Sequence, residues 1–353
     1  MKKLLIISNG HGEDLVGAKL AQALSGFEID AFPLVGTGSY YEGLPVNLIG
    51  PVKSFPSGGF SARNLFTLPS DIKAGYLHHL NDQWHVLKDS KDRYDLAVAI
   101  GDLVPLAAVY TLKASFIFVG VNKSKYYHSF GFYYTAWEKW MLKKAEAVFA
   151  RDEITAQDLA GSKIKALYYG NPLMDCIGEI ANADLRAANE DKLVIGFLPG
   201  TRDEDVFYNI QDFYSVTREL NKFDRHFEFL VATNAGTLDG MEKAPFADVL
   251  ERSDVIIGLS GTGNEQAAGM GKPVVAFPGR GSQYTKKFAS AQKQLLGEAL
   301  CLVERKPEKI ADAVWSIIND HTRYEYMSNT GKQRMGGPGA VEKIAAYIKE
   351  RHA

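Results

Sequence analysis

DVIIGLSGTGNEQAAGMGKPVVAFP, residues 254–278, decides the fold class of this chain. It begins with a short apolar run, passes through a loop rich in glycine, and ends in a second apolar run after Pro273. Strands as apolar as these are buried on both faces, which is typical of parallel sheets with helices on each side. The stretch therefore predicts a strand, a glycine turn, a helix from about Asn264 and a second strand of an α/β protein.

The same alternation of apolar runs and helical spacing recurs along most of the chain. The runs KLLIIS (3–8), DLAVAI (95–100) and KLVIGFLP (192–199) are each followed by a stretch with helical periodicity. A chain of 353 residues has room for about two domains. We therefore expect two parallel sheets, each with its own layer of helices.

A polar stretch with turn signals, residues 170–192, marks the boundary between the two sheets. We place the first domain in residues 1–175 and the second in residues 176–335. Residues 336–353 open with glycine and proline and then continue as one amphipathic helix. Between Phe32 and Asp92 the glycine- and proline-rich sequence predicts a strand near VNLIG and a long irregular connection.

The composition and net charge of the chain exclude several classes of function. The net charge of −2 gives no general attraction to nucleic acid, and we expect no nucleic-acid partner. Cys176 and Cys301 fit neither a metal spacing nor a disulfide framework, so we expect a reducing, cytoplasmic compartment. Asp102 and Pro105 interrupt the longest apolar stretch, so any membrane contact should be peripheral. The acidic helix starts serve the helix dipole, and no metal site is predicted.

The loop SGTG, residues 260–263, predicts a phosphate site. Glycines at a strand-to-helix turn let backbone N–H groups approach an anion, and the helix N-terminus adds a partial positive charge. The spacing matches neither a Walker loop, nor a dinucleotide fingerprint, nor a hydrolase elbow. Glu265 in the first helical turn would repel a phosphate, so we expect it to bind a ribose diol. The alternative is a glutamate that only complements the helix dipole.

A second loop of the same kind follows the strand near residue 195. Gly200 and Thr201 form the turn, and Arg202 offers a guanidinium suited to a diphosphate. Alternatively, Arg202 lies on the surface and pairs with Asp203 or Asp205. Two anion-competent loops on one sheet favour a nucleotide-diphosphate site. The predicted donor-site residues are Gly200, Thr201, Arg202, Ser260, Gly261, Thr262, Gly263 and Glu265.

Several motifs carry a resemblance to a known family. Those that resemble the donor domain of lipid-A-disaccharide synthase, a GT-B glycosyltransferase, are LPGTR (198–202), SGTGNEQAAGMGKPVV (260–275) and YYGNPLMD (168–175). NGHGEDLVGAKLAQAL resembles its N-terminal glycine-rich motif, with shared Asp14 and Gly17. The lipid-A-disaccharide synthase-related family is more similar still, through SNGHGED, FARDEITAQDL and PGRGSQYTKKFASAQ. The resemblance covers nearly the whole chain.

The resemblance implies a GT-B fold, in which two Rossmann-like parallel-sheet domains face a central cleft and the C-terminal helix returns to the first domain. It also implies an inverting transfer from a UDP-sugar, such as an N-acetylhexosamine donor, to a lipid-linked acceptor without a cofactor or metal. Gly10 and His11 depart from the synthase, which has a glutamate and a small residue there. Two alternatives stay open: a non-hydrolysing UDP-sugar 2-epimerase and a non-catalytic nucleotide-sugar binding protein.

The catalytic base should come from the first domain, at a strand end. Asp102 looks like an aspartate essential in the synthase, and its alternative role is an N-cap of the helix that follows. Histidine side chains titrate near neutral pH, so His11 is the second candidate, or else it fixes its own loop. Glu13 and Asp14 are expected to cap the first helix. The remaining predicted acceptor-side residues are Gly10, Gly12 and Asn122.

An aromatic and basic stretch, residues 122–150, predicts an interfacial helix. Its apolar face carries Met141 and continues to Ala145 and Val148. The predicted membrane contacts are Trp137, Lys139, Trp140, Lys143 and Lys144. The alternative is that the tryptophans pack into the domain core. With a lipid acceptor, the protein would lie on the inner face of the cytoplasmic membrane.

Overall fold

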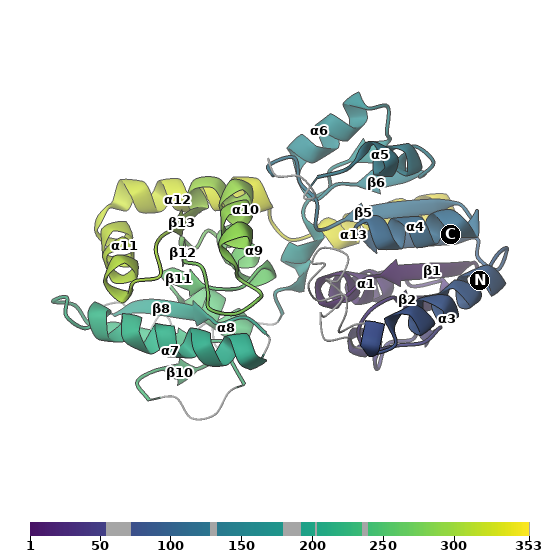
Figure 1. The fold of residues 1–353 in the computed structure, drawn as a ribbon. Coiled ribbons are helices and arrows are strands. Elements are labelled where there is room, and N and C mark those ends of the chain that lie inside the picture. The colour runs from purple at the N-terminus through teal and green to yellow at the C-terminus, as the bar shows by residue number, and fades with distance from the viewer. Residues whose placement is uncertain (54–71, 128–132, 179–191, 202, 235–238, 353) are drawn as a thin grey trace. The chain divides into compact units, whose positions relative to one another are not determined.

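The computed structural model describes residues 1–53, 72–127, 133–178, 192–201, 203–234 and 239–352 (Figure 1). The chain forms two compact units. Unit 1 comprises Met1–Lys125, Ser129–Cys176 and Pro338–Ala353, and unit 2 comprises Tyr126–His128 and Ile177–Gly337. The main division, after Cys176, lies one residue from the boundary predicted after residue 175.

Unit 1 contains a seven-stranded sheet in the order β3-β2-β1-β4-β5-β6-β7, and all its strand pairs are parallel. The strands are β1 (Lys3–Ser8), β2 (Glu28–Pro33), β3 (Asn47–Leu48), β4 (Leu96–Gly101), β5 (Phe116–Gly120), β6 (Ala147–Phe149) and β7 (Ala166–Leu167). The chain runs outward from β1 to β3 and then restarts at β4 on the other side of β1. The strand order therefore reverses between β1 and β4, which is where open parallel sheets bind ligands.

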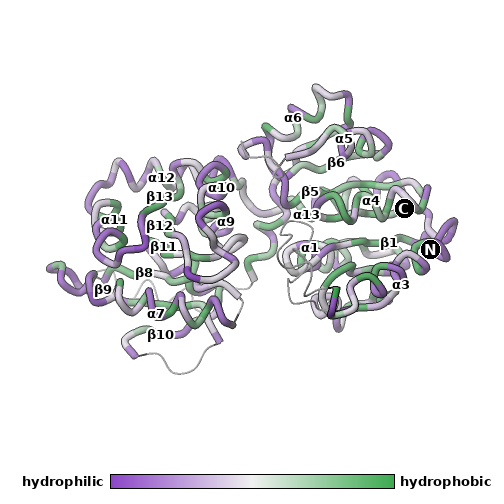
Figure 2. The backbone as a smooth tube through the Cα atoms, viewed as in Figure 1, coloured by the Kyte–Doolittle hydropathy of each residue, from purple (hydrophilic) through white to green (hydrophobic). Residues whose placement is uncertain are grey.

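Helices cover both faces of this sheet, as the apolar strands predict (Figure 2). Leu4 and Ile6 pack in one core cluster with residues of α1 and α13. Leu5 and Ile7 point the other way, into a second cluster with residues of α4 and α5. The helical elements are α1 (His11–Ala23), η1 (Ser39–Tyr41), α3 (Tyr76–Asp89), α4 (Leu103–Leu112), α5 (Ala136–Leu142), α6 (Glu153–Gly161), η2 (Pro172–Cys176) and α13 (Ala340–His352).

Unit 2 repeats the design with a six-stranded parallel sheet in the order β10-β9-β8-β11-β12-β13. Its strands are β8 (Leu193–Leu198), β9 (Phe227–Val231), β10 (Glu242–Lys243), β11 (Val255–Gly258), β12 (Val274–Ala276) and β13 (Leu300–Leu302). Its helical elements are α7 (Asp203–Leu220), α8 (Phe246–Arg252), α9 (Thr262–Gly269), α10 (Lys286–Leu296), η4 (Gly297–Ala299), α11 (Pro307–Asn319) and α12 (His321–Met335). The order reverses between β8 and β11. The opening stretch of sequence forms β11, α9 and β12, as predicted.

The C-terminal helix α13 belongs to unit 1 (Figure 1). It packs against α1, and Val341, Ile344 and Ile348 lie in the core that α1 covers. The carboxylate of Asp175 accepts hydrogen bonds from the backbone N–H groups of Gly339 and, at 2.8 Å, Val341. These bonds satisfy amides that a helix start would otherwise leave without partners.

Two local expectations were wrong. The region from Phe32 to Asp92 contains the 14-residue helix α3, which its glycine- and proline-rich beginning concealed. The helix with the two tryptophans ends at Leu142, and Val148 lies in strand β6 instead of on the same helix. Val148 sits opposite Phe118 of β5. The apolar spacing continues by chance across the helix end, and strand pairing decides the conformation there.

Candidate functional site

The carboxyl ends of β8 and β11 bring the two predicted donor loops together in unit 2. Gly200 has a φ of 88°, and a Cβ atom there would lie 3.3 Å from the Leu259 carbonyl oxygen and 3.2 Å from Gln283 Oε1. Glycine therefore allows both the backbone conformation and the close approach of the loops. Thr201 is exposed beside Gly200, while Arg202 lies outside the described residues.

Helix α9 begins at this edge. Gly261 is its N-cap and supplies no side-chain cap, while Ser260 Oγ accepts from the Gly263 N–H at 3.2 Å. Thr262 is exposed at the first helical position. Glu265 lies in the first turn and is 8% exposed, so its position would suit a contact with a ligand near the helix start. Backbone N–H groups and a helix N-terminus make this edge suitable for an anion.

Three buried polar side chains hold the loop after β11 in place. Asn264 Nδ2 donates to the Gly258 carbonyl at 3.0 Å, and Gln292 Nε2 donates to the Gly261 carbonyl at 2.7 Å. Tyr284 donates to Gln292 Oε1 at 2.5 Å, and burial raises the pKa of its hydroxyl. The loop is therefore fixed before any ligand arrives. Sequence reasoning missed these residues, although Tyr284 and Gln292 lie in the quoted motif PGRGSQYTKKFASAQ.

A third loop completes this edge of unit 2. Asp205, which is 5% exposed, accepts from the backbone N–H groups of Gln283 at 2.9 Å and Ser282 at 3.1 Å. Gly281 leaves no space for a side chain, because a Cβ there would lie 1.6 Å from Asp205 Oδ1. Asp205 therefore holds this loop in place through its backbone, a role that the predicted pairing with Arg202 did not include.

The corresponding edge of unit 1 lies at the ends of β1 and β4. Gly10, with a φ of 113°, is the N-cap of α1, whose first two residues are His11 and Gly12. The side chain of His11 lies outside the described residues. Asp102 is the N-cap of α4, and its Oδ1 accepts from the Val104 N–H at 3.2 Å. Asp102 therefore has the helix-capping role that was its alternative interpretation. This role does not exclude catalysis by the same carboxylate.

Glu13 lies at the same edge. It is 8% exposed, and its Oε1 accepts a hydrogen bond from the side-chain amide of Asn122, which follows β5. Gly101 has a φ of 126°, and a Cβ there would lie 2.8 Å from Glu13 Cγ. The structure thus brings Glu13, Asn122 and the Gly101–Asp102 turn together. Sequence reasoning assigned Glu13 to helix capping and missed this contact across 109 positions.

Asp14 is turned into the core of unit 1 and is 3% exposed, and its carboxylate has a hydrogen bond with the backbone of Gly10, the N-cap residue of α1. It accepts from Ser8 Oγ at 2.6 Å, and Ser8 also lies 2.9 Å from the Tyr41 hydroxyl. Burial raises the pKa of Asp14 to about 7, although the bond from Ser8 opposes this shift. A Cβ at Gly17 would lie 2.1 Å from the Tyr41 hydroxyl oxygen. Asp14 and Gly17 therefore serve one buried network.

The outer face of α5 presents the two predicted tryptophans to solvent. Trp137 is 65% and Trp140 46% exposed, and their rings stack with centroids 5.1 Å apart. The alternative of tryptophans packed in the core is wrong. Lys143 and Lys144 are exposed as well. Among the described residues, no helix has the length and apolar character needed to cross a membrane.

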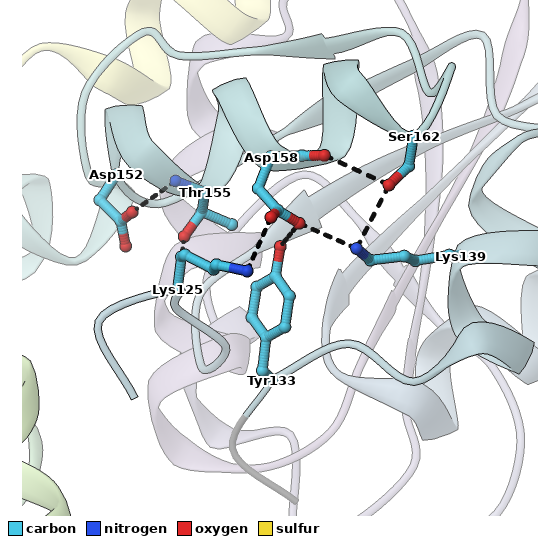
Figure 3. Close-up of polar contacts among 7 residues, drawn as sticks. All are labelled: Lys125, Tyr133, Lys139, Asp152, Thr155, Asp158 and Ser162. Atoms are coloured by element: carbon cyan, nitrogen blue, oxygen red, sulfur yellow. Dashed lines mark hydrogen bonds and ion pairs between the residues drawn. The ribbon is translucent and has the colours of Figure 1, made fainter. Parts of the chain in front are cut away.

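Lys139 belongs to a network between α5 and α6 (Figure 3). Asp158 forms ion pairs with Lys139 at 2.8 Å and Lys125 at 2.7 Å, and it also accepts from the Tyr133 hydroxyl. Partial burial works against ionisation of Asp158, but these donors hold its pKa well below the usual range. Lys139 also lies 3.3 Å from Ser162 Oγ. Its charge is engaged within unit 1, which corrects its grouping with Lys143 and Lys144 as a membrane contact.

No family model and no curated protein matches the sequence. Solved structures match over nearly the full length. A putative UDP-N-acetylglucosamine 2-epimerase from Listeria monocytogenes is 16% identical, with a TM-score of 0.64 over 99% of this chain and 96% of that one. The calicheamicin glycosyltransferase CalG4 is 14% identical, with a TM-score of 0.65 over 100% of both chains. UDP-GlcNAc 2-epimerase from Neisseria meningitidis, bound to UDP-GlcNAc, is 15% identical, with a TM-score of 0.59 over 99% and 100%.

This chain has the GT-B fold. At these identities the likeness establishes the fold alone, and it includes both glycosyltransferases and epimerases. None of these matches points specifically to lipid-A-disaccharide synthase.

Proposed function

We propose that this protein transfers a sugar from a UDP-sugar to a hydroxyl group of a lipid-linked acceptor, with inversion at the anomeric carbon. The observation that carries the proposal is the meeting of two glycine turns at the β8–β11 reversal, with α9 beginning directly after the turn that follows β11. This is the place and the chemistry for a nucleotide diphosphate. Of the similar structures, the Neisseria enzyme holds UDP-GlcNAc, and the S. aureus MnaA structure contains UDP.

In this proposal the diphosphate binds between Gly200 and Thr201 on one side and residues 260–263 on the other. Arg202 adds a charge-assisted contact, so that protein groups neutralise the diphosphate without a metal. Glu265 accepts hydrogen bonds from the ribose hydroxyls. The helix start and the backbone N–H groups then stabilise the negative charge that develops on UDP as it leaves.

The chemical step needs a base at the unit 1 edge. Asp102 takes the proton of the acceptor hydroxyl, whose oxygen forms a bond to the anomeric carbon while the bond from that carbon to the diphosphate oxygen breaks. His11 is the second candidate for the same role. The aspartate that caps α4 is positioned by that bond, because capping fixes its side chain at the strand end.

A 2-epimerase is the second candidate function. The observation that favours it is the equal likeness to two such enzymes, together with the carboxylates of Glu13 and Asp102 at the unit 1 edge. An epimerase moves a proton at carbon 2 of the sugar and needs acidic groups beside the ring. Both functions use the same nucleotide site and differ in the product.

The acceptor and the location are part of the proposal. Trp137 and Trp140 on α5, followed by Lys143 and Lys144, form a small aromatic and basic face. Such a face suits the interface of an anionic membrane. We place the protein peripherally on the inner face of the cytoplasmic membrane, where a lipid-linked hydroxyl would be presented.

The deciding experiment uses UDP-N-acetylglucosamine with and without membrane lipid extract. Lipid-dependent release of UDP, with a glycosylated lipid seen by mass spectrometry, supports the transferase. Formation of the 2-epimer without lipid supports the epimerase. Binding of UDP by calorimetry without either product supports a non-catalytic binding protein, and failure to bind any UDP-sugar contradicts the proposal as a whole.

A further inference from the structure

The connection between β12 and α10, residues 277–285, lies at the carboxyl edge of the unit 2 sheet, beside the turn that follows β11. It closes on itself, because the Gly279 N–H donates to the Tyr284 carbonyl at 2.8 Å. Tyr284, which is 2% exposed, holds the end of this loop, and its hydroxyl donates to Gln292 Oε1 at 2.5 Å. Strand β12 and Tyr284 thus fix the two ends of the loop, and the contacts of its middle decide where it lies.

Helix α7 provides the contacts of the middle of this loop. Asp205, in the first turn of α7, accepts from the Gln283 N–H at 2.9 Å with one carboxylate oxygen and from the Ser282 N–H at 3.1 Å with the other. Hydrogen bonds to a carboxylate are stronger than those between neutral groups, and a helix start favours the negative charge. The carboxylate is 5% exposed and both its oxygens bind the loop, so Asp205 acts on a ligand through the loop.

The loop fits closely around this carboxylate. A Cβ on Gly281 would lie 1.6 Å from Asp205 Oδ1 and 2.2 Å from its Cγ. Gly281 does not have the left-handed backbone conformation that would itself require glycine. The need for glycine at this position therefore comes from the carboxylate beside it.

The same face of α7 also holds the turn after β8. Asn209, four residues after Asp205 and 2% exposed, donates from Nδ2 to the Pro199 carbonyl at 2.9 Å. The other polar atom of its side chain, Oδ1, lies 3.3 Å from the position of a Cβ on Gly279. One face of α7 thus contacts both the turn after β8 and the loop after β12.

The two segments that α7 holds meet at Gly200, in the predicted diphosphate turn. Gln283 Oε1 lies 3.2 Å from the position of a Cβ on Gly200, and the Leu259 carbonyl oxygen lies 3.3 Å from the same position. The loop 279–283 therefore borders the Gly200 turn and limits the space beside it. A displacement of the loop changes the shape of that space.

We infer that Asp205 is a positioning residue of the nucleotide site: its carboxylate holds the loop 279–283 beside the Gly200 turn, so that the site is formed before the nucleotide binds. The identity of the ligand as UDP rests on the proposed function. Binding to a site that is already formed avoids the cost of ordering the loop. Without the carboxylate, the affinity falls with the fraction of molecules in which the loop keeps its place.

The test is calorimetric titration of UDP into the full-length wild type and Asp205→Asn, together with hydrogen–deuterium exchange of residues 279–283 in the free proteins. Asparagine offers one acceptor oxygen where aspartate offers two, so exchange in the loop should be faster. If the loop keeps its place in about a tenth of the molecules, the affinity for UDP falls about tenfold. Asp224→Asn, the same change at an exposed position of unit 2, is the matched control and should alter neither quantity.

Gly281→Ala tests the same contact while the carboxylate remains in the protein. The new Cβ would collide with Asp205 Oδ1, so this variant should also bind UDP more weakly and exchange faster in the loop. Gly337→Ala is its control, because no atom of the residues that the structure describes lies within 4 Å of a Cβ there. Both test substitutions break one contact, so the double variant should lose little more affinity than either single variant.

Three results overturn the inference: UDP binds Asp205→Asn as tightly as the wild type, exchange in the loop does not rise, or the losses in the double variant add in full. Thermal unfolding of each variant separates weaker binding from loss of fold. If Asp205→Asn does not fold, Gly281→Ala decides by the same two measurements. Failure of the wild type to bind UDP contradicts the proposed function and this inference together, whereas equal binding by the variants contradicts the positioning role alone.

Discussion

The carboxyl edges of the two sheets have the same topology and opposite chemistry. In unit 2, the β8–β11 reversal presents glycine turns and a helix N-terminus, which suit an anion. In unit 1, the β1–β4 reversal presents Glu13 and Asp102, which suit hydroxyl donors. One folding pattern thus presents two strand-end edges of different chemistry. The side chains that follow each strand decide the chemistry of each edge.

The supports beneath the two edges also differ. In unit 2, Asn264 and Gln292 donate to loop carbonyls, and the Tyr284 hydroxyl donates to Gln292 Oε1. In unit 1, the buried network beneath the glycine turn contains Asp14, whose carboxyl group titrates near neutral pH. The network beneath the glycine turn of unit 1 should therefore respond to pH in the neutral range.

The largest effect that would sharpen this contrast concerns Asp14. Its folded-state pKa of about 7 lies above the unfolded value, so the folded state binds more protons in between. Stability from this group is fully present below about pH 4 and is lost as the pH rises through 7. Between about pH 5 and pH 8 the unfolding free energy should fall by roughly 3 kcal/mol relative to Asp14→Asn.

Urea unfolding of the wild type and of Asp14→Asn at both pH values measures this difference. The groups that interact with Asp14 are Ser8, the backbone of Gly10, Tyr40 and Tyr41. If the unfolding free energies of the wild type and Asp14→Asn depend on pH in the same way, the proposed role of Asp14 is contradicted.

The next effect concerns the chemistry of the unit 1 edge. Asp102→Asn should lower turnover by roughly 10², the loss expected for a general base. Asparagine caps helices as well as aspartate, so the unfolding free energy should change by less than about 0.5 kcal/mol. Steady-state UDP release and thermal unfolding report the two quantities separately. Full activity would reduce Asp102 to a cap and make His11 the first candidate.

A substitution at the unit 2 edge should change the affinity for UDP instead of the turnover. Glu265→Ala should weaken UDP affinity by about 1–3 kcal/mol, since a ribose hydroxyl loses its acceptor. Isothermal titration with UDP measures the change, and titration of Asp102→Asn serves as the comparison, with affinity near that of the wild type. Equal affinities in Glu265→Ala and the wild type would remove Glu265 from the donor site.

The smallest expected effect concerns membrane binding, which tests whether the acceptor hydroxyl group belongs to a lipid. Each lysine near an anionic surface contributes about 1 kcal/mol, screened by salt. A larger fraction of the wild-type protein should float with anionic vesicles than with neutral ones. That fraction should fall as the salt concentration rises. Lys143→Gln with Lys144→Gln should remove most of that preference, whereas Lys139→Gln should matter less because Asp158 engages its charge. No preference at low salt would favour a soluble acceptor.

Much of the donor edge could be predicted because its signals are local. A strand, a glycine turn and a helix start are consecutive in the sequence, so Gly200 and residues 260–263 could be placed at strand ends. The missed residues act across long separations. Glu13 meets Asn122 across 109 positions, and Gln292 reaches the Gly261 carbonyl across 31. From the sequence alone, a glutamate in the first turn of a helix is interpreted as a cap. Its contact with Asn122 follows only from the arrangement of the strands.

The sequence by itself determined the α/β class and the glycine turns, because apolar periodicity and turn chemistry act between near neighbours. Only the tertiary structure decided that β8 lies beside β11 and β1 beside β4, which brings the turns together in pairs. It also decided that Lys139 pairs with Asp158 while Trp137 faces solvent. Strand order and side-chain partners depend on packing between distant segments, and no short stretch of sequence contains that information.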